Sequence, residues 1–303
     1  MKQQITTSKA SERPASGFWN DVGQLVKLRL SVTVVLSSVL AYLIALGPNA
    51  SLSWWALFVL TAGGLLTTGA ANALNEVLEK DYDKMMARTS SRPLATGQWS
   101  VSDGVMAAGF MFLIGVTLLA LFNPWTAFLG TFSLVSYAFV YTPMKRVGPA
   151  AVFIGAVPGA LPALIGCTAA QGDITWLGFT LFVIQFFWQL PHFYAIGFLG
   201  YEDYKRAGFK LVMENNGQVD GNRLGREAFW AATSLIPLAF VPYLLQYSSL
   251  PAAIGVAVIG LLFSTVAYDF WRKPERQTAL RTMFASFLYI PLAFSTFWID
   301  QLI

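Results

Sequence analysis

Long, continuous stretches of apolar residues are the feature that most constrains how this chain can fold. A helix needs about 20 mostly apolar residues to cross a bilayer. Nine stretches approach or reach this length, and they cover approximately residues 30–47, 54–78, 104–122, 125–142, 149–170, 174–200, 228–246, 250–270 and 282–300. Because they are continuous and do not alternate, they predict helices and not strands. We therefore expect an all-α integral membrane protein with nine transmembrane helices.

The composition supports this interpretation and excludes several functional classes. Hydrophobic residues make up 55% of the chain and charged residues 12%, whereas a soluble domain carries about 25% charged residues. An ordinary soluble enzyme and a DNA-binding domain are therefore excluded, and we expect membrane lipid and no nucleic acid among the partners. Cys167 and His192 are the only cysteine and histidine, which excludes an internal disulfide and a His-rich metal site.

The basic residues predict the orientation. All 20 Lys and Arg lie before the first apolar stretch or after the second, fourth, sixth and eighth. The alternate loops, near Pro48, Asn123, Gln171 and Tyr247, contain none. By the positive-inside rule, this places the N-terminus in the cytoplasm and, with nine spans, the C-terminus outside. The short N-terminal segment favours a bacterial plasma membrane over an organelle membrane.

The domain organisation is simple. Residues 1–17 are rich in Ser, Thr and Lys and predict a disordered cytoplasmic N-terminus. Residues 18–303 form a single expected domain. It begins with an amphipathic helix at the membrane interface, about residues 18–28. Its largest soluble parts are the cytoplasmic loops at about 79–103 and 201–227.

A first acidic segment lies at the cytoplasmic end of the second apolar stretch. Asn75, Glu79 and Asp83 recur at every fourth position and share one helix face, with Glu76 beside them. Carboxylates stacked in this way repel each other, and a divalent cation would reverse that effect. Oxygen ligands suit Mg²⁺, which usually takes one or two carboxylates together with substrate phosphates and waters. The alternative is a solvated helix end of mixed charge, since Lys80 is adjacent.

Basic residues near this segment are typical of diphosphate binding. Arg88 and Arg92 follow the carboxylates and could hold a diphosphate. Tyr141 and Lys145, four residues apart after the fourth stretch, could both reach a phosphate oxygen. The alternative for each of these residues is ordinary positive-inside anchoring.

Two further features lie in and after the sixth stretch. Glu202 and Asp203 belong to a second acidic cluster, which could face the first across a helix bundle or could be an ordinary charged loop. His192 lies inside the apolar stretch itself, and an ionisable residue there is a functional candidate. It could ligate haem iron, act as a general base, or form a hydrogen bond to a neighbouring helix.

The first acidic segment carries a family resemblance. The pattern Asn75-Glu76-x-x-Glu79-x-x-x-Asp83, followed by Arg-Thr at 88–89 and Arg-Pro-Leu at 92–94, resembles the first aspartate-rich motif of the UbiA superfamily of intramembrane prenyltransferases. That family usually has Asp where this chain has Glu76 and Glu79, and the extra methylene shifts the geometry of a metal site. The resemblance covers roughly residues 25–300. It implies helices bundled around a central intramembrane cavity that opens to the cytoplasm.

Three local stretches resemble the branch of this superfamily that farnesylates haem. They are residues 141–146, residues 155–166, and Pro191-His192-Phe193 together with residues 202–208. This resemblance implies transfer of the farnesyl group of farnesyl diphosphate to the 2-vinyl group of haem b, with addition of water, giving haem O. The product would serve haem A and terminal oxidase synthesis, so haem A synthase or terminal oxidase assembly factors are possible partners.

The resemblance also implies roles for individual residues. The implied catalytic residues are Asn75, Glu79, Asp83, Asp203 and Lys145. The implied ligands of the cofactor Mg²⁺ are Asn75, Glu76, Glu79, Asp83, Glu202 and Asp203, with Asp81 as a possible helper. The implied diphosphate ligands are Arg88, Arg92, Tyr141, Lys145 and Lys205. His192 is the candidate for contacting haem.

Three other functions remain open from the sequence. A UbiA-type enzyme for an aromatic or other lipid acceptor would share the first acidic motif and ignore haem. A non-catalytic haem-binding membrane protein would not need Glu79 and Asp83. A transporter belongs to a different class, although a carboxylate face at a helix end fits diphosphate chemistry better than a substrate site at the membrane midplane.

Overall fold

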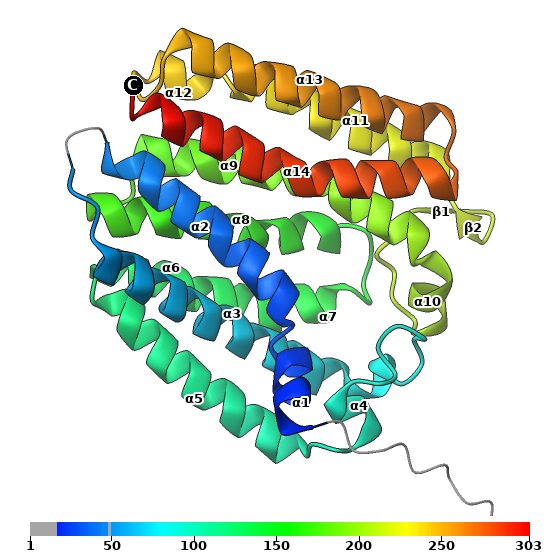
Figure 1. Cartoon of the computed structure of the whole chain (residues 1–303). Helices are drawn as coiled ribbons and strands as arrows, with labels where there is room; N and C mark the ends of the chain where they lie inside the picture. The colour runs from blue at the N-terminus through cyan, green and yellow to red at the C-terminus, as the bar shows by residue number, and fades with distance from the viewer. Residues whose placement is uncertain (1–16, 48–49) are drawn as a thin grey trace, which may run out of the picture.

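A computed structural model describes residues 17–47 and 50–303, and almost all of its regular structure is helical (Figure 1). The elements are α1 Phe18–Leu25, α2 Leu28–Leu46, α3 Trp54–Asp83, α4 Pro93–Thr96, α5 Val101–Ala120, α6 Pro124–Val135, the π-helix η1 Ser136–Tyr141, α7 Thr142–Met144, α8 Ala151–Gln171, α9 Trp176–Leu199, α10 Tyr201–Arg206, β1 Glu214–Asn215, β2 Gln218–Val219, α11 Gly221–Leu238, α12 Val241–Leu244, α13 Leu250–Arg272 and α14 Arg276–Asp300. The strands form one small antiparallel hairpin.

Within these described ranges, nine helical segments are long and apolar enough to cross a membrane. The fourth combines α6, η1 and α7, and the seventh combines α11 and α12. The prediction of an all-α protein with nine spans is confirmed. Its boundaries shift most at the starts of α11 and α14, which begin at Gly221 and Arg276, and at the end of α3, which continues to Asp83.

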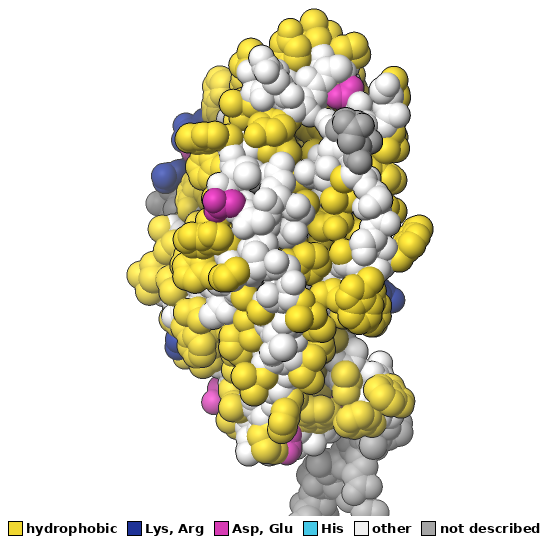
Figure 2. Space-filling view, turned by 90° about the vertical axis from the view of Figure 1, so that its left-hand side faces the viewer, with side chains coloured by type: hydrophobic (Ala, Val, Ile, Leu, Met, Phe, Trp, Pro, Cys, Tyr) yellow, Lys and Arg dark blue, Asp and Glu magenta, His cyan; other side chains and the backbone are white. Residues whose placement is uncertain are grey.

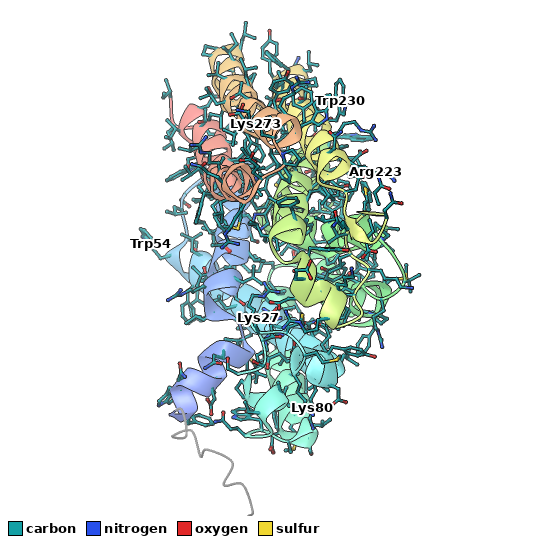
Figure 3. The ribbon with its side chains drawn as sticks, turned by 90° about the vertical axis from the view of Figure 1, so that its right-hand side faces the viewer. Lys27, Trp54, Lys80, Arg223, Trp230 and Lys273 are labelled. Carbon is teal, nitrogen blue, oxygen red and sulfur yellow. The ribbon has the colours of Figure 1, made fainter. Side chains whose placement is uncertain are left out.

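The helices lie side by side, so that alternate connections gather at the same end of the molecule. In Figure 1, α1, α4, α7, α10 and the β1–β2 hairpin all lie toward one end. We call this the basic end. Figure 3 views the molecule from it and labels Lys27, Lys80, Arg223 and Lys273 from four separate segments. Figure 2 shows the opposite end, where hydrophobic and uncharged groups dominate and dark blue groups appear only at the margins. The charge asymmetry expected from the sequence is therefore present in three dimensions.

Small residues allow the helices to pack closely. A Cβ atom on Gly166 of α8 would lie 2.0 Å from the carbonyl oxygen of Ser38 on α2. A Cβ atom on Gly225 of α11 would lie 2.5 Å from the Cα atom of Trp271 on α13. Gly166, in the fifth apolar stretch, thus serves helix packing, as expected for helices in a bilayer.

The segment before the first span is partly described. Residues 1–16, for which we predict disorder, lie outside the described residues. Helix α1 occupies the region expected to lie at the membrane interface, and its Phe18 and Trp19 side chains are 62% and 82% exposed. Aromatic side chains exposed in this way suit the boundary between lipid and water.

Candidate active site

The acidic motif lies on the last turns of α3, and its polar side chains are buried. The exposed fractions are 1% for Asn75, 0% for Glu76, 4% for Glu79 and 1% for Asp83. With 30 residues, α3 is longer than the roughly 20 residues that a span needs, so its last turns reach the basic end. Buried carboxylates are costly unless they are paired. This face of α3 therefore depends on cations from other segments.

Two of the predicted diphosphate ligands supply those cations. Lys145 places its Nζ atom 2.9 Å from Oε1 and 3.1 Å from Oε2 of Glu79. Arg92 donates from Nη1 to Oδ2 of Asp83 at 2.7 Å, and its Nε atom lies 3.5 Å from Oε1 of Glu76. The structure thus brings the acidic motif together with Arg92 and Lys145, which come from two different connections.

Lys27 is a third cation of this site, and sequence reasoning missed it. Its Nζ atom donates to Oδ1 of Asn75 at 2.7 Å, while the amide nitrogen of Asn75 donates to Oγ1 of Thr142 at 3.1 Å. Burial and the nearby charges of Arg92 and Lys145 lower the pKa of the Lys27 ammonium below its usual value. In the sequence, Lys27 precedes the first span, where positive-inside anchoring already explains a lysine, so no local signal marked it.

A π-helical turn shapes the other wall of the site. The turn η1 covers Ser136–Tyr141 and ends next to Thr142. The rings of Tyr137 and Tyr141 lie 5.5 Å apart, and the Lys145 Nζ atom lies 4.8 Å from the centre of the Tyr141 ring. A Cβ atom on Gly155 would lie 2.5 Å from Cε2 of Tyr141, so this glycine leaves room for the ring. π-turns occur frequently at functional sites.

Two connections at the basic end pack on each other beside the carboxylates. Phe209, after α10, is 6% exposed and packs with Met86, which follows α3. The Phe209 ring also lies 5.7 Å from the ring of Tyr82 and 5.9 Å from the Lys145 Nζ atom. Arg88 lies over the ring of Tyr204 at 5.9 Å. Arg88 is thus held at this junction and not directly against the acidic motif.

The second acidic cluster has a different environment. Asp203 forms an ion pair with Arg206 at 3.2 Å, and Glu202 is exposed. Lys205 donates to the carbonyl oxygen of Gly217 in the β1–β2 turn at 2.7 Å. Among the residues that the structure describes, no hydrogen bond or ion pair joins these three to the carboxylates of α3. The structure therefore does not bring the two acidic clusters into direct contact.

The donor atoms of α3 fit a Mg²⁺ ion that is shared with a substrate. Oε2 of Glu76 and Oδ1 of Asp83 are buried, and no hydrogen bond reaches them from any described residue. Among all the residues that the structure describes, no three His, Cys, Asp or Glu side chains gather closely enough to hold a metal by themselves. Mg²⁺ commonly binds through one or two carboxylates, with phosphate oxygens and waters completing its ligands. Asp81 stands apart, because it is exposed and pairs with Lys84.

His192 lies on α9, away from the carboxylates, and is half-buried. Its Nδ1 atom lies 2.8 Å from Oγ of Ser286 on α14. Its ring stacks on Trp188 with 6.2 Å between the ring centres, and the Phe287 ring lies edge-on at 5.0 Å. The structure thus contains the hydrogen bond to a neighbouring helix that was one of the three roles considered for His192. This bond uses Nδ1 and not Nε2.

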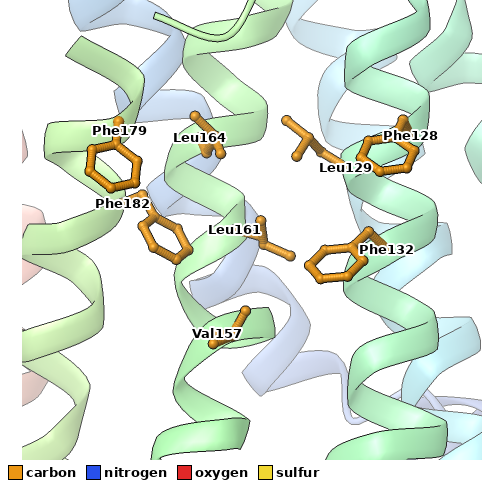
Figure 4. Close-up of a pocket in the computed structure, with 8 residues that line it drawn as sticks. All are labelled: Phe128, Leu129, Phe132, Val157, Leu161, Leu164, Phe179 and Phe182. Atoms are coloured by element: carbon orange, nitrogen blue, oxygen red, sulfur yellow. The ribbon is translucent and has the colours of Figure 1, made fainter. Parts of the chain in front are cut away.

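An apolar groove of about 240 Å³ lies between α6, α8 and α9 (Figure 4). Only hydrophobic side chains line it, among them Phe128, Leu164 and Phe179. Phe128 lies in the first turns of α6 and Phe179 in the first turns of α9, so both are near the end opposite to the carboxylates. We therefore assign this groove to the lipid-facing surface and not to the active site.

Comparison with known proteins identifies the class. The model of the UbiA prenyltransferase family matches residues 34–289. The fold is similar to that of digeranylgeranylglyceryl phosphate synthase, with a TM-score of 0.75, 15% identity, and coverage of 94% of this chain and 98% of the other. It is also similar to a UbiA homologue from Archaeoglobus fulgidus bound to GPP and Mg²⁺, with a TM-score of 0.64, 14% identity, and coverage of 91% and 99%. The chain belongs to the UbiA prenyltransferase family.

Relatives with closer sequences narrow the comparison. The chain is 38% identical over 280 residues to the protoheme IX farnesyltransferase of Cytophaga hutchinsonii, covering 92% of this chain and 96% of the relative. It is 32% identical over 311 residues to the protoheme IX farnesyltransferase of Koribacter versatilis, covering 99% of both. These full-length similarities agree with the haem-farnesylating branch that the three local stretches resemble.

Proposed function

We propose that this protein transfers the farnesyl group of farnesyl diphosphate to the 2-vinyl group of haem b, giving haem O and diphosphate. Its membership of the UbiA family supports the prenyl transfer. The names of its full-length relatives support the haem acceptor. The observation that carries the mechanism is the face of α3 on which Glu79 and Asp83 are buried against Lys145 and Arg92.

The basic end is proposed to face the cytoplasm of a bacterium whose plasma membrane holds the protein. The positive charges at this end support the orientation. Farnesyl diphosphate carries a charged head and an apolar tail, so the head would enter at this end and the tail would lie among the spans. Residues 18–303 would then act as one domain. The connections after α3 and after α10, which pack together through Met86 and Phe209, would lie beside the charged head.

The diphosphate is proposed to bind between the acidic motif and its cations. Asn75, Glu76, Glu79 and Asp83 would hold Mg²⁺, which when bound neutralises charge on the diphosphate. Arg92 and Lys145 would turn from the carboxylates toward diphosphate oxygens. Lys27 would turn from the Asn75 amide, and Arg88 would reach the same oxygens from its place over the Tyr204 ring. Such preorganised positive charge stabilises the leaving group as the bond from C1 of the farnesyl group to oxygen breaks.

The second acidic cluster is proposed to act from the other side of the substrate. Asp203 is the member placed best for this role, because it is only 27% exposed, and it would serve as a further carboxylate for metal. Glu202 and Lys205 are exposed. They would add charge at the entrance rather than hold a substrate atom.

The allylic cation left on the farnesyl group must be kept from water until haem reacts. Tyr137, Tyr141 and Phe209 place aromatic rings beside the charged site, and aromatic faces attract cations. The terminal carbon of the haem vinyl group then bonds to C1. The positive charge moves to the vinyl carbon next to the pyrrole ring, where the oxygen of a water molecule adds and a proton is released. His192 is proposed to contact the haem iron.

The proposal is tested with the full-length protein in detergent, haem b, farnesyl diphosphate and Mg²⁺. Mass spectrometry should detect a haem that has gained a farnesyl group and water. The product should disappear with EDTA and in Asp83→Asn. Prenyl transfer to an aromatic acceptor and not to haem would refute the proposed acceptor. A protein that ionises no prenyl diphosphate in the presence of Mg²⁺ would not be a prenyltransferase of this kind.

A further inference from the structure

Two side chains of α9 contact the same residue of α14. Trp188 donates from its indole nitrogen to the backbone carbonyl of Ser286 at 2.6 Å. One turn further along, Nδ1 of His192 lies 2.8 Å from the Oγ atom of Ser286. Ser286 is fully buried, with 0% exposure. The imidazole ring is therefore anchored to a rigid part of the helix packing through one serine.

The hydroxyl proton of Ser286 decides which nitrogen of His192 carries a proton. Oγ of Ser286 donates to the carbonyl oxygen of Met283 at 2.6 Å. A serine hydroxyl has a single proton to donate. With that proton assigned to the Met283 carbonyl, which can only accept, the Ser286 oxygen acts as the acceptor at the His192 contact. The Nδ1 atom of His192 must then carry hydrogen. In a neutral imidazole this leaves the lone pair on the Nε2 atom.

The Nε2 atom is free to meet a ligand. The side-chain hydrogen bond of the His192 ring uses Nδ1, the ring also has a hydrogen bond to the backbone of Met283, and Nε2 is not among the buried polar atoms that lack a partner. The ring is kept in place by Trp188, which stacks at an angle of 13°, and by Phe287, which is 47% exposed. Apolar rings next to a free imidazole nitrogen suit a large, flat, apolar macrocycle with a metal at its centre.

We propose that Ser286 is a positioning residue, which fixes His192 with hydrogen on Nδ1 and presents Nε2 to the iron of haem b. This inference rests on the proposed function, because it takes haem as the acceptor. Metal-binding histidines commonly donate their other N–H to an oxygen, which orients the ring and raises the basicity of the ligand. Ser286 fills that role here with a hydroxyl whose proton is already used.

The test uses the full-length protein in detergent with ferrous haem b and without farnesyl diphosphate. Resonance Raman spectra should show an iron–histidine stretching band, which is absent in His192→Ala. In Ser286→Ala the band should move to lower frequency, because the imidazole loses its hydrogen-bond acceptor. Haem binding should weaken by about 10-fold or more, as is typical for the loss of such a partner. Ser286→Thr retains a hydroxyl and should restore the wild-type band.

A matched control is Ser264→Ala. Ser264 is also buried, at 4% exposure, and its hydroxyl pairs with Thr233 on α11 and not with His192. It should leave the band and the haem affinity unchanged. A band and an affinity in Ser286→Ala equal to those of the wild type would overturn the inference, as would the absence of an iron–histidine band in the wild type.

The inference and the proposed function fail in distinguishable ways. Wild-type protein that makes farnesylated haem, with no effect of Ser286→Ala on the Raman band, would overturn the role of Ser286 and leave the proposed function intact. Wild-type protein that makes no farnesylated haem, although its iron–histidine band responds to Ser286→Ala, would overturn the proposed function and support the positioning of His192.

Discussion

The two acidic segments look alike in the sequence and differ strongly in the structure. On α3, Glu79 is 4% exposed and Asp83 is 1% exposed; Glu79 pairs with the distant Lys145, and Asp83 pairs with Arg92 from the connection that follows α3. On α10, Glu202 is exposed and Asp203 pairs with Arg206 only three residues away. The same residue types thus form a buried charge network in one place and a partly solvated surface cluster in the other.

This difference indicates where strong charge pairing is built into the protein. A buried carboxylate interacts strongly with its partner, because little water screens the pair. An exposed ion pair contributes about 0–1 kcal/mol and is screened by salt. We therefore expect the α3 segment to dominate both stability and catalysis, and the α10 segment to act mainly through Asp203.

The largest effect should come from Asp83→Asn. The substitution keeps the shape of the side chain but removes a charge that faces Arg92 and, in the proposed function, Mg²⁺. Loss of one preorganised electrostatic contact typically costs about 10²–10³ in kcat, and we expect a fall of that size in farnesyl transfer to haem. Quantitative mass spectrometry of the haem product measures it. Asp81→Asn is the control, since Asp81 is exposed. Equal losses of kcat in Asp83→Asn and Asp81→Asn would contradict the expectation that the buried carboxylate matters more than the exposed one.

Lys145→Met should cost the most stability. It leaves Glu79 buried without its cation, and breaking such a pair typically costs about 3–5 kcal/mol. The double variant Glu79→Gln with Lys145→Met should recover most of that loss, as seen in denaturant unfolding in detergent. Lys84→Met is the control, because its pair with Asp81 has the similar distance of 2.8 Å but is exposed. An equal loss in this control would show that burial does not set the strength of these pairs.

The sequence predicted the helices and the shared face of α3 better than it predicted the partners of the buried side chains. The nine spans and the shared face of Asn75, Glu79 and Asp83 follow from local patterns, since helix periodicity and apolar length are local properties. Two of these residues have partners far along the chain: Glu79 and Lys145 are 66 residues apart, and Lys27 and Asn75 are 48 apart, whereas Asp83 and Arg92 are only nine apart. Their pairing depends on how the spans pack.

Two other features could not be predicted for the same reason. The π-turn before Thr142 has no sequence signal that distinguishes it from an ordinary helix end, although it determines where Tyr137 and Tyr141 lie. The sequence also could not show that Lys205 binds the β1–β2 turn, because a two-residue strand pair has little periodicity to detect. The role of each candidate site residue stays a prediction that the experiments above address.

Gly155→Ala should have an intermediate effect on the α3 side. The new methyl group would lie 2.5 Å from Cε2 of Tyr141, so the ring must move away from its place beside Lys145. Overpacking of this kind typically costs about 1–3 kcal/mol. We expect a lower melting temperature and a higher KM for farnesyl diphosphate. Gly109→Ala is the control, since nothing lies within 4 Å of its Cβ position on the helix α5. A wild-type KM for farnesyl diphosphate in Gly155→Ala would show that the position of the Tyr141 ring does not matter for diphosphate binding.

The smallest effect should come from Glu202→Gln. Glu202 is exposed, and substitutions at such surface positions usually change stability by no more than about 0.5 kcal/mol. We expect kcat and the melting temperature to stay close to the wild-type values at physiological salt. Asp203→Asn, measured beside it, should lower kcat further, because Asp203 is less exposed. A loss in Glu202→Gln as large as that in Asp83→Asn would mean that α10 closes onto the substrate and buries Glu202. The two acidic segments would then differ only in the substrate-free protein, and the second would become as important to the reaction as the first.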